Sequence, residues 1–318
     1  MEQRDKQVEQ PMENTSNTQN GEGSERWPAL PYEAWRETCQ TLHLWTQIVG
    51  KVRMALSPYL NRWWHVTLYV TPLGLTTSAI PYHSGTFDVN FDIIEHNISI
   101  RTSEGTTKVL PLIPRSVAAF YREFMDCLHV LGIQVTMNTF PSEVSNPIRC
   151  DIDEVHASYD SLYAQRFWRI LVQTEAIMQR YRSPFLGKSS PVHSFWGSFD
   201  LALTFFSGRR APERPGADRM TREAYSHEVI SCGFWTGDDR FPTPAFYSYT
   251  SPQPSGLPTA QIRPEEAFYS HELRLFLLRY DDVRSASSPE LALLEFFQST
   301  YEAGATLARW DREALERR

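Results

Sequence analysis

The chain has 318 residues, of which 41% are hydrophobic and 13% aromatic, so it can bury a substantial core in one large domain or two ordinary ones. A formal net charge of −7 argues against a broadly basic surface, and therefore against a nucleic-acid partner, but it does not exclude a small anionic ligand. The four cysteines form no C-x-x-C pair, which argues against a structural zinc site and favours free thiols in a reducing cytosol.

The first 25 residues are predicted to be a disordered tail, because Gln, Glu, Asn, Ser, Thr and Gly dominate them and cannot offset the entropy of ordering. Order is expected to begin near Trp27. The sequence contains no apolar run of the roughly 18 residues needed to span a bilayer. The N-terminus also lacks the apolar centre of a signal peptide. These features predict a cytoplasmic protein without a membrane partner.

Residues 32–57 are predicted to form a long helix, because apolar side chains recur at spacings of three and four. A second stripe contains His43 and Gln47, one turn apart, followed by Gly50. This stripe is either a polar flank at the edge of the core or a pocket wall in which Gly50 leaves room for an approaching group. Both interpretations place His43 and Gln47 on the same face.

The next segments alternate between apolar and polar residues, which predicts an antiparallel meander. The expected strands span residues 63–71, 87–93, 98–102 and 106–112. Pro114 is expected to open a helix that ends near Leu131, since proline is favoured in the first turn. Residues 132–153 are expected to be a strand-and-loop connector, and a second long helix is expected at about 159–181.

Alternation continues from Val192 to Phe206, so this stretch is predicted to be one half-buried strand. His193 would share the apolar face, whereas Trp196 and Asp200 would lie on the other face. The second face is either an ordinary solvated surface or the floor of a pocket, with Trp196 as a wall and Asp200 as a charged anchor.

The two halves of the chain share an order of elements. Each has a long helix, then Ser-Pro-aromatic-Leu (Ser57 or Ser183), then a histidine (His65 or His193) at the head of a strand, and finally a helix opened by proline. The predicted fold is α+β, with antiparallel sheets, long flanking helices and a tandem α-β-α repeat of about 126 residues around a pseudo-twofold axis. Residues 26–318 would form a single unit made of halves at about 26–150 and 151–318.

Two long loops follow the central strand. Residues 207–222 are rich in arginine and include Arg209 and Arg210, and residues 251–264 contain four prolines. Loops of this length are often lids or binding segments, although ordinary mobile loops look the same. Between them, residues 224–235 are predicted to form a strand in which His227 and Glu228 point to opposite faces.

No motif for a serine hydrolase elbow, a dinucleotide-binding loop or a Walker loop is present. The catalytic candidates are His193, His227 and Asp200, although His193 and Asp200 are expected on opposite faces. The ligand-binding candidates are His43, Gln47, His65, Trp196, Arg209 and Arg210. A histidine-ligated metal would use His43, His193, His227 and Glu228, but no motif supports such a cofactor. For each histidine taken alone, a structural hydrogen-bonding role is the favoured interpretation.

Several long motifs resemble one known family. They are Trp27-Pro28-Ala29-Leu30-Pro31, Leu42-His43-Leu44-Trp45-Thr46-Gln47-Ile48-Val49-Gly50-Lys51 and Ser190-Pro191-Val192-His193-Ser194-Phe195-Trp196-Gly197-Ser198-Phe199-Asp200-Leu201. With these segments the chain resembles the bacterial family DUF5996, whose function is unknown, over roughly residues 27–312. The resemblance implies no activity, cofactor or catalytic residue.

Two functional hypotheses follow from the residues. The first is an enzyme that acts on a small polar or anionic molecule in an aromatic-walled pocket with histidine, aspartate and arginine groups. The alternative is a non-catalytic module that binds a small ligand or another protein. Convergence of His43, His193, His227 and Arg209 on one cavity would favour the enzyme, whereas scattered positions would favour the alternative.

Overall fold

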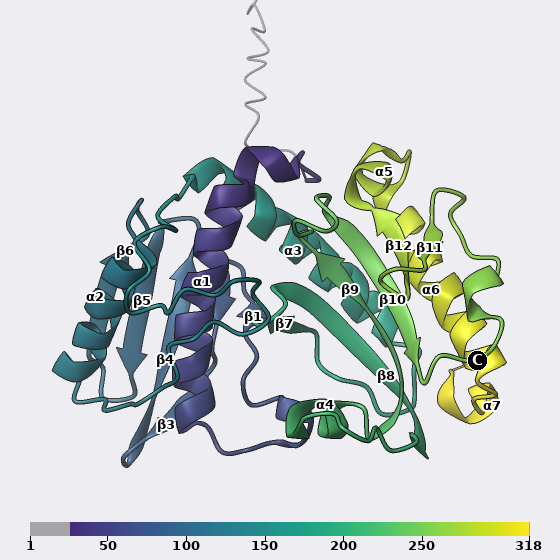
Figure 1. Ribbon diagram of the computed structural model, residues 1–318, viewed down its shortest axis with the longest axis horizontal. Coiled ribbons are helices and arrows are strands. Elements are labelled where there is room, and N and C mark those ends of the chain that lie inside the picture. Colours follow the sequence, from purple (N-terminus) through teal and green to yellow (C-terminus); the bar gives the residue numbers. More distant parts are fainter. Residues whose placement is uncertain (1–25, 318) are drawn as a thin grey trace, which may run out of the picture.

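The computed structural model describes residues 26–317 (Figure 1), so the tail predicted for residues 1–25 lies outside the described range. The helices are α1 (Tyr32–Leu56), α2 (Val117–Val130), α3 (Ser161–Arg182), α4 (Arg219–Ala224), α5 (Tyr280–Ser285), α6 (Pro289–Leu307) and α7 (Arg312–Leu315), with short 3-10 turns η2 (Asn61–Trp63) and η3 (Leu257–Thr259). These helices accompany two antiparallel sheets, so the predicted α+β class is confirmed.

The first sheet is a meander in the order β1-β2-β4-β5-β6, with β3 also paired to β4. Its strands are β1 (Tyr69–Val70), β2 (Gly74–Thr76), β3 (Ile80–Tyr82), β4 (Gly85–Asp92), β5 (Asn97–Thr102) and β6 (Thr107–Pro111). Strands β2 and β3 pair with opposite ends of β4, so together they act as one broken strand.

The second sheet has the order β7-β8-β9-β10-β12-β11. Its strands are β7 (His193–Phe195), β8 (Asp200–Arg210), β9 (His227–Trp235), β10 (Ala245–Ser251), β11 (Phe268–Ser270) and β12 (Leu275–Arg279). One face carries large apolar side chains such as Leu203 and Phe234, whereas the other carries hydroxyls, tyrosines and Asp200. This alternation is the pattern expected of a sheet with one face against the core.

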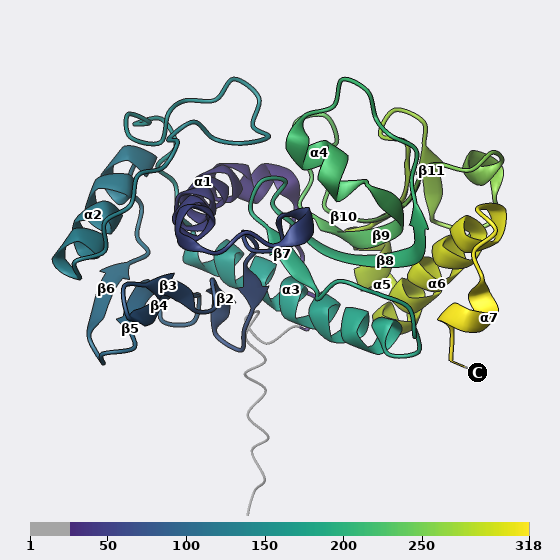
Figure 2. The same cartoon turned by 90° about the horizontal axis from the view of Figure 1, so that it is seen from below.

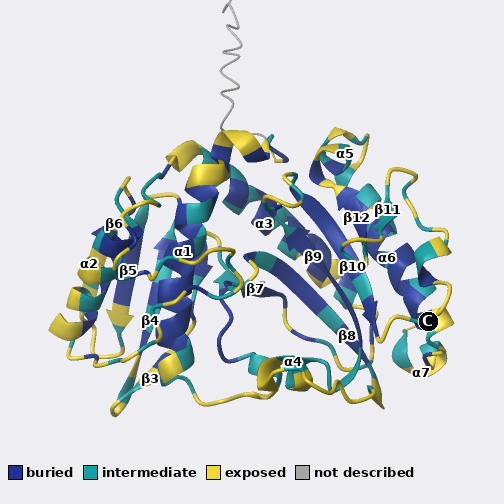
Figure 3. Ribbon diagram, viewed as in Figure 1, coloured by how far each residue is buried: buried dark blue, intermediate teal, exposed yellow. Residues whose placement is uncertain are grey.

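Helices cover one face of each sheet. Figure 2 shows α1 and α3 crossing the middle of the molecule, with α2 beside the first sheet and α6 beside the second. Side-chain caps start two of them: Asp160 accepts hydrogen bonds from the first-turn amides of α3, and Ser116 accepts one from the amide of Ala119 in α2. Burial concentrates along the central strands and α1 (Figure 3).

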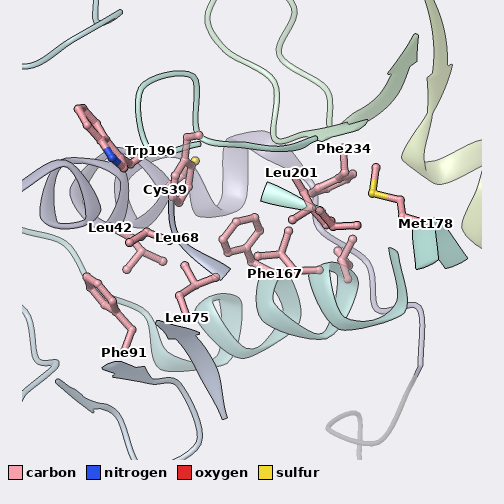
Figure 4. Close-up of a cluster of buried hydrophobic side chains, with 14 of the residues drawn as sticks. Cys39, Leu42, Leu68, Leu75, Phe91, Phe167, Met178, Trp196, Leu201 and Phe234 are labelled. Atoms are coloured by element: carbon pink, nitrogen blue, oxygen red, sulfur yellow. The ribbon is translucent and has the colours of Figure 1, made fainter. Parts of the chain in front are cut away.

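A single hydrophobic cluster joins the two sheets. Figure 4 shows this core running from Phe91 in β4, past Leu42 in α1 and Phe167 in α3, to Leu201 and Phe234 in the second sheet. The residues of this core come from both halves of the chain, so neither half buries its apolar face alone.

The prediction of one strand from Val192 to Phe206 is wrong. The chain forms a hairpin instead, in which β7 pairs with β8 through a turn at residues 196–199. A four-residue turn swaps the faces of odd- and even-numbered residues, so His193 lies on the face of Ala202 although the sequence alternates without a break. Phe199, with φ of 53°, adopts the left-handed conformation at the end of this turn.

Other segments are also less regular than predicted. Of the expected strand 63–71, Tyr69–Val70 form β1 and Leu68 forms a single bridge, because the 3-10 turn η2 occupies the beginning. The connector at residues 132–153 contains no strand in the described structure, and its backbone runs as turns and bends. Residues 207–222 are not a simple loop, because β8 extends to Arg210 and α4 begins at Arg219.

The tandem repeat stays a prediction. The strand orders are compatible with it, since β1, β2 with β3, β4, β5 and β6 occupy the same successive positions as β7, β8, β9, β10 and β12. Strand β11 has no counterpart at the edge of the first sheet. Within residues 26–317, no helix is both long and apolar enough to cross a bilayer.

Candidate functional site

A cavity of about 940 Å³ lies where α1 and residues 141–156 face the polar side of the second sheet. Its lining includes the aromatic residues Tyr32, Phe199, Tyr225, Trp235, Tyr247 and Tyr249. Five carboxylate residues also line it, namely Glu143, Asp153, Asp200, Asp238 and Asp239. Arg240 is the one arginine among the described lining residues, and it pairs with Asp238 at 2.7 Å. The cavity is therefore aromatic and acidic.

Asp200, the first residue of β8, is a cavity carboxylate that two hydroxyl groups hold in place. The Tyr247 hydroxyl on β10 donates to its Oδ2 at 2.5 Å, and the Ser198 hydroxyl donates to its Oδ1. Burial raises the pKa of Asp200 above its ordinary value, while these two hydrogen bonds offset part of that increase. The residue can therefore exchange a proton closer to neutral pH than an exposed aspartate can.

Glu143 approaches the same region from the connector. Its side chain lies against Gly197, because a Cβ added to Gly197 would meet Glu143 Oε1 at 2.6 Å. Burial, and then the negative charge of Asp200, raise the pKa of Glu143. Neither carboxylate forms an ion pair with a cationic side chain in the described range. Together they concentrate uncompensated acidity at one end of the cavity.

His43 and Gln47 position the two segments that carry these carboxylates. His43 Nε2 lies 2.9 Å from the carbonyl oxygen of Trp196 and 3.0 Å from that of Gly197, and its ring stacks on Phe199. One turn later, the Gln47 amide donates to the carbonyl of Ser142 at 2.8 Å and accepts from the Ser142 N–H at 2.7 Å. The predicted shared face is present, and it holds both loops.

The two members of this pair differ in their access to the cavity. His43 lines it, whereas Gln47 is fully buried. Burial lowers the pKa of His43 to about 4, so the ring is neutral at pH 7. Besides the two carbonyl oxygens, the Gln47 amide nitrogen lies 2.9 Å from His43 Nε2, so the same atom contacts both acceptors and a donor.

A second histidine, His156, faces the cavity beside Asp153. Asp153 Oδ2 accepts from His156 Nδ1 at 2.7 Å, and its Oδ1 accepts from the backbone N–H groups of Val155 and His156. The Asp153 side chain is almost fully buried, whereas about a quarter of the His156 side chain is exposed. A carboxylate on Nδ1 fixes the tautomer and leaves Nε2 as the basic atom.

Trp196 lies outside the cavity lining. Its indole packs on Gly50 of α1, so closely that an added Cβ at Gly50 would lie 2.2 Å from the ring. The indole N–H donates to the carbonyl of Val66 at 2.7 Å. The room that Gly50 provides is therefore filled by Trp196, within the core.

The histidines at the strand heads also lie away from the cavity lining. His65 Nδ1 accepts from the Leu60 N–H at 3.3 Å, and its ring packs between Tyr59 and Trp63. His193 is 1% exposed and pairs across strands with Ala202. The expectation that His193 and Asp200 lie on opposite faces is wrong, because the hairpin brings them to the same face.

The remaining candidates form a structural cluster. Arg209 donates to Glu228 at 2.7 Å and to the carbonyl oxygens of Ala308 and Arg309 at the end of α6. Arg210 is exposed and pairs with His227 between β8 and β9, and His227 Nδ1 lies 3.1 Å from the Ser226 hydroxyl. Convergence of four residues on one cavity would have favoured an enzyme. Only His43 lines the cavity, whereas His193, His227 and Arg209 do not.

The proposed metal ligands do not gather either. Between residues 26 and 317, no group of three or more histidine, cysteine, aspartate or glutamate side chains could hold a metal ion. His43 lies on α1 and His193 begins β7. His227 and Glu228 lie at the start of β9.

The chain matches the model of the DUF5996 family, a family of unknown function, over residues 27–317. It therefore belongs to that family. Searches of curated proteins and of solved structures gave no match.

Several cavity residues were not predicted from the sequence. Tyr247 and Tyr249 alternate on one face of β10, which is a local signal, but nothing in the sequence says that this face is opposite α1. Glu143 and the Asp153–His156 pair lie in an irregular connector, where no periodicity exists to assign a direction to a side chain.

Proposed function

We propose that this protein binds a small polar molecule with a positively charged group in the cavity between α1 and the second sheet. The observation that supports this proposal is the unbalanced acidity of the lining, in which five carboxylate residues accompany one arginine that is already paired. An amine or guanidine would neutralise Glu143 and Asp200, whereas an anion there would meet repulsion.

The aromatic residues suit the same class of ligand. Trp235, Tyr247 and Tyr249 present rings, and a cation gains from the face of an aromatic ring when water is excluded. The hydroxyl groups of the tyrosines and the imidazole of His43 supply directional polar contacts. A few oriented polar groups within aromatic walls are typical of small-molecule sites.

The test is thermal and calorimetric titration of the full-length protein with matched amines, guanidines and carboxylates. Amines should stabilise it, by about 2.7 kcal/mol at a concentration one hundred times the Kd, and carboxylates of the same skeleton should not. Asp200→Asn and Glu143→Gln should each weaken amine binding. Glu104→Gln, in the exposed 103–105 turn, is the matched control. Equal responses to amines and carboxylates would contradict the proposal.

Acid–base catalysis on the bound molecule is the second candidate, and the Asp153–His156 pair favours it. A neutral imidazole oriented by a buried carboxylate is a common general base. A screen of chromogenic esters, amides and glycosides should detect turnover that His156→Gln and Asp153→Asn abolish without lowering Tm. If no substrate is turned over, or if turnover survives in both variants, the non-catalytic binding function stands instead.

A further inference from the structure

Arg62 lies on the same polar face of the second sheet as the cavity, but at its far end. Its guanidinium stacks on the ring of Phe206 in β8 at 4.3 Å from the centroid. Arg62 and Trp63 have φ of 60° and 62°, a conformation that bulky residues rarely adopt. The Arg62 N–H donates to Glu223 Oε1 at 2.9 Å, so α4 holds this strained turn in place. Strain of this kind is often retained where it orients a functional side chain.

The charge of Arg62 is not neutralised. Its Nη1 atom is buried without a hydrogen-bond partner, and within residues 26–317 the side chain forms no ion pair. Glu223 is occupied by the Arg62 N–H and by the Tyr59 hydroxyl. Burial lowers the pKa of Arg62 to about 10, so the guanidinium stays charged at pH 7. Arg62 as a whole is partly buried, and a partly buried charge without a counter-ion is unfavourable.

The charge of Arg62 interacts with two tyrosines that line the cavity. The Tyr249 and Tyr225 hydroxyls partly offset the effect of burial on Arg62, lie 3.2 Å from each other, and belong to residues that line the cavity. Arg214 stacks over Tyr225 at 4.1 Å and donates to the Ser251 hydroxyl at 2.6 Å. Two guanidinium groups and two phenols thus meet at this end.

We infer that Arg62, with the hydroxyls of Tyr225 and Tyr249, forms a subsite for an oxyanion, such as a carboxylate or a phosphoryl group. A guanidinium offers several N–H donors in one plane, which suits two oxygens of one anion. The phenols add neutral donors without a competing charge. An oxyanion here would supply the missing counter-ion of Arg62.

The subsite would make the ligand bipolar. Asp200 and Glu143 provide acidity at one end of the cavity, and Arg62 provides a positive charge beyond the tyrosines at the other. A molecule that carries both an amine and an oxyanion would match the two ends. This consequence rests on the proposed function, whereas the oxyanion subsite itself does not.

The experiment measures binding of inorganic phosphate and of acetate to the full-length protein at constant ionic strength, by thermal shift and calorimetry. Wild type should be stabilised by at least one of the two anions. Arg62→Met keeps an unbranched side chain on Phe206 but removes the charge, so it should weaken anion binding at least tenfold. Without anion, this variant should be as stable as wild type or more stable, because it has no buried unpaired charge. Arg210→Met, at an exposed arginine that forms no ion pair within residues 26–317, is the control and should bind as wild type does.

If Arg62→Met fails to fold, Tyr249→Phe provides the second variant and should weaken the anion several-fold. The inference is overturned if wild type responds to neither anion, or if the folded variants bind the anion as wild type does. Amine binding serves as the separate readout for the proposed function. If amines bind and anions do not, the proposed amine site is supported and the oxyanion subsite is rejected. If anions bind and amines do not, the oxyanion subsite is supported and the proposed function is rejected.

Discussion

Leu68 and Ser194 exchange two backbone hydrogen bonds, each N–H donating to the other residue's carbonyl at 2.9 Å. This antiparallel bridge joins the two sheets, because Leu68 directly precedes β1 and Ser194 lies within β7. The two residues are separated by 194 − 68 = 126 positions, which equals the separation 183 − 57 = 126 between the Ser-Pro pairs that follow α1 and α3.

A reciprocal bridge between equivalent residues is the arrangement that a twofold axis imposes on two antiparallel strands. The bridge thus supports the proposed tandem repeat, whose axis would pass between Leu68 and Ser194. Superposition of residues 32–130 on residues 161–307 is the measurement that decides it. A rotation far from 180°, or an axis remote from the bridge, would contradict the repeat.

The Trp45→Ala variant tests the core face of α1. The Trp45 indole is fully buried and stacks on Phe120 at 5.0 Å and on Tyr159 at 5.6 Å. Removing so large a buried ring should lower the free energy of unfolding by about 3–5 kcal/mol. The urea midpoint measures this loss, with Val130→Ala on the exposed side of α2 as the control. A near-zero change would place Trp45 outside the core.

A Gly50→Ala substitution should destabilise the protein, although alanine is normally better than glycine in a helix by about 1 kcal/mol. The sign reverses because the new methyl group would overlap the Trp196 indole at 2.2 Å. We expect a loss of roughly 1–3 kcal/mol, the range for overpacking a core. Introduced into a Trp196→Ala background, the same change should become neutral or stabilising. An unchanged loss in that background would locate the strain elsewhere.

The Gln47→Leu variant tests the clamp on the connector. It removes a side chain that both donates to and accepts from the backbone of Ser142. Leaving those backbone groups unpaired should cost about 1–3 kcal/mol for each group that stays buried. Amine binding should also weaken, because Glu143 follows Ser142 directly. Gln179→Leu, at an exposed position on α3, is the control. If Q47L matches Q179L in both measurements, the clamp has no positioning role.

The elements that the sequence predicted well are those specified by local periodicity. The helix predicted at 32–57 is α1, and those predicted near 114–131 and 159–181 are α2 and α3, each within a few residues. Each helix contains its own stripe of apolar residues, and α2 and α3 also have side-chain caps, so no distant contact is needed to predict them.

The candidate site could be predicted only in part, because its geometry depends on long-range packing. Asp200 and His43 were selected from the sequence and do line the cavity. The turn at 196–199 could not be predicted, since it contains Phe199 rather than glycine in the left-handed conformation. Without that turn, the sequence places His193 and Asp200 on opposite faces. Glu143 reaches Asp200 only through the fold of an irregular connector.

Acid should destabilise the protein partly through His193. Burial lowers the pKa of His193 from 6.5 to about 3. As pH falls below 6.5, the unfolded chain therefore binds a proton at this residue, whereas the folded protein does not. Stability is then fully present above pH 6.5 and is lost as pH falls towards the folded pKa, by up to about 1.4 kcal/mol per pH unit. Urea unfolding at pH 7, 6 and 5 should show a shallower loss in His193→Asn than in wild type or in the exposed variant His271→Asn. If wild type and His193→Asn lose stability equally as pH falls, protonation of His193 does not contribute to the acid sensitivity.

The Asp200→Asn variant should have the opposite dependence on pH. Because the pKa of Asp200 is raised in the folded state, the folded protein retains a proton that the unfolded chain releases near the ordinary aspartate pKa of about 3.9. Wild type therefore loses stability as pH rises through the raised pKa, at no more than about 1.4 kcal/mol per pH unit. Asparagine has no such proton, and the Tyr247 hydroxyl can still hydrogen-bond to it.

The stability of Asp200→Asn relative to wild type should consequently increase between pH 4 and pH 7. Urea unfolding across that range measures the difference, with Glu104→Gln as the control. Removing the charge at Asp200 also lowers the pKa of Glu143, which faces it, so the remaining carboxyl should ionise at a lower pH. If the difference between variant and wild type is constant with pH, Asp200 is already ionised at pH 4, and its carboxylate serves as a permanent counter-charge for a cationic ligand.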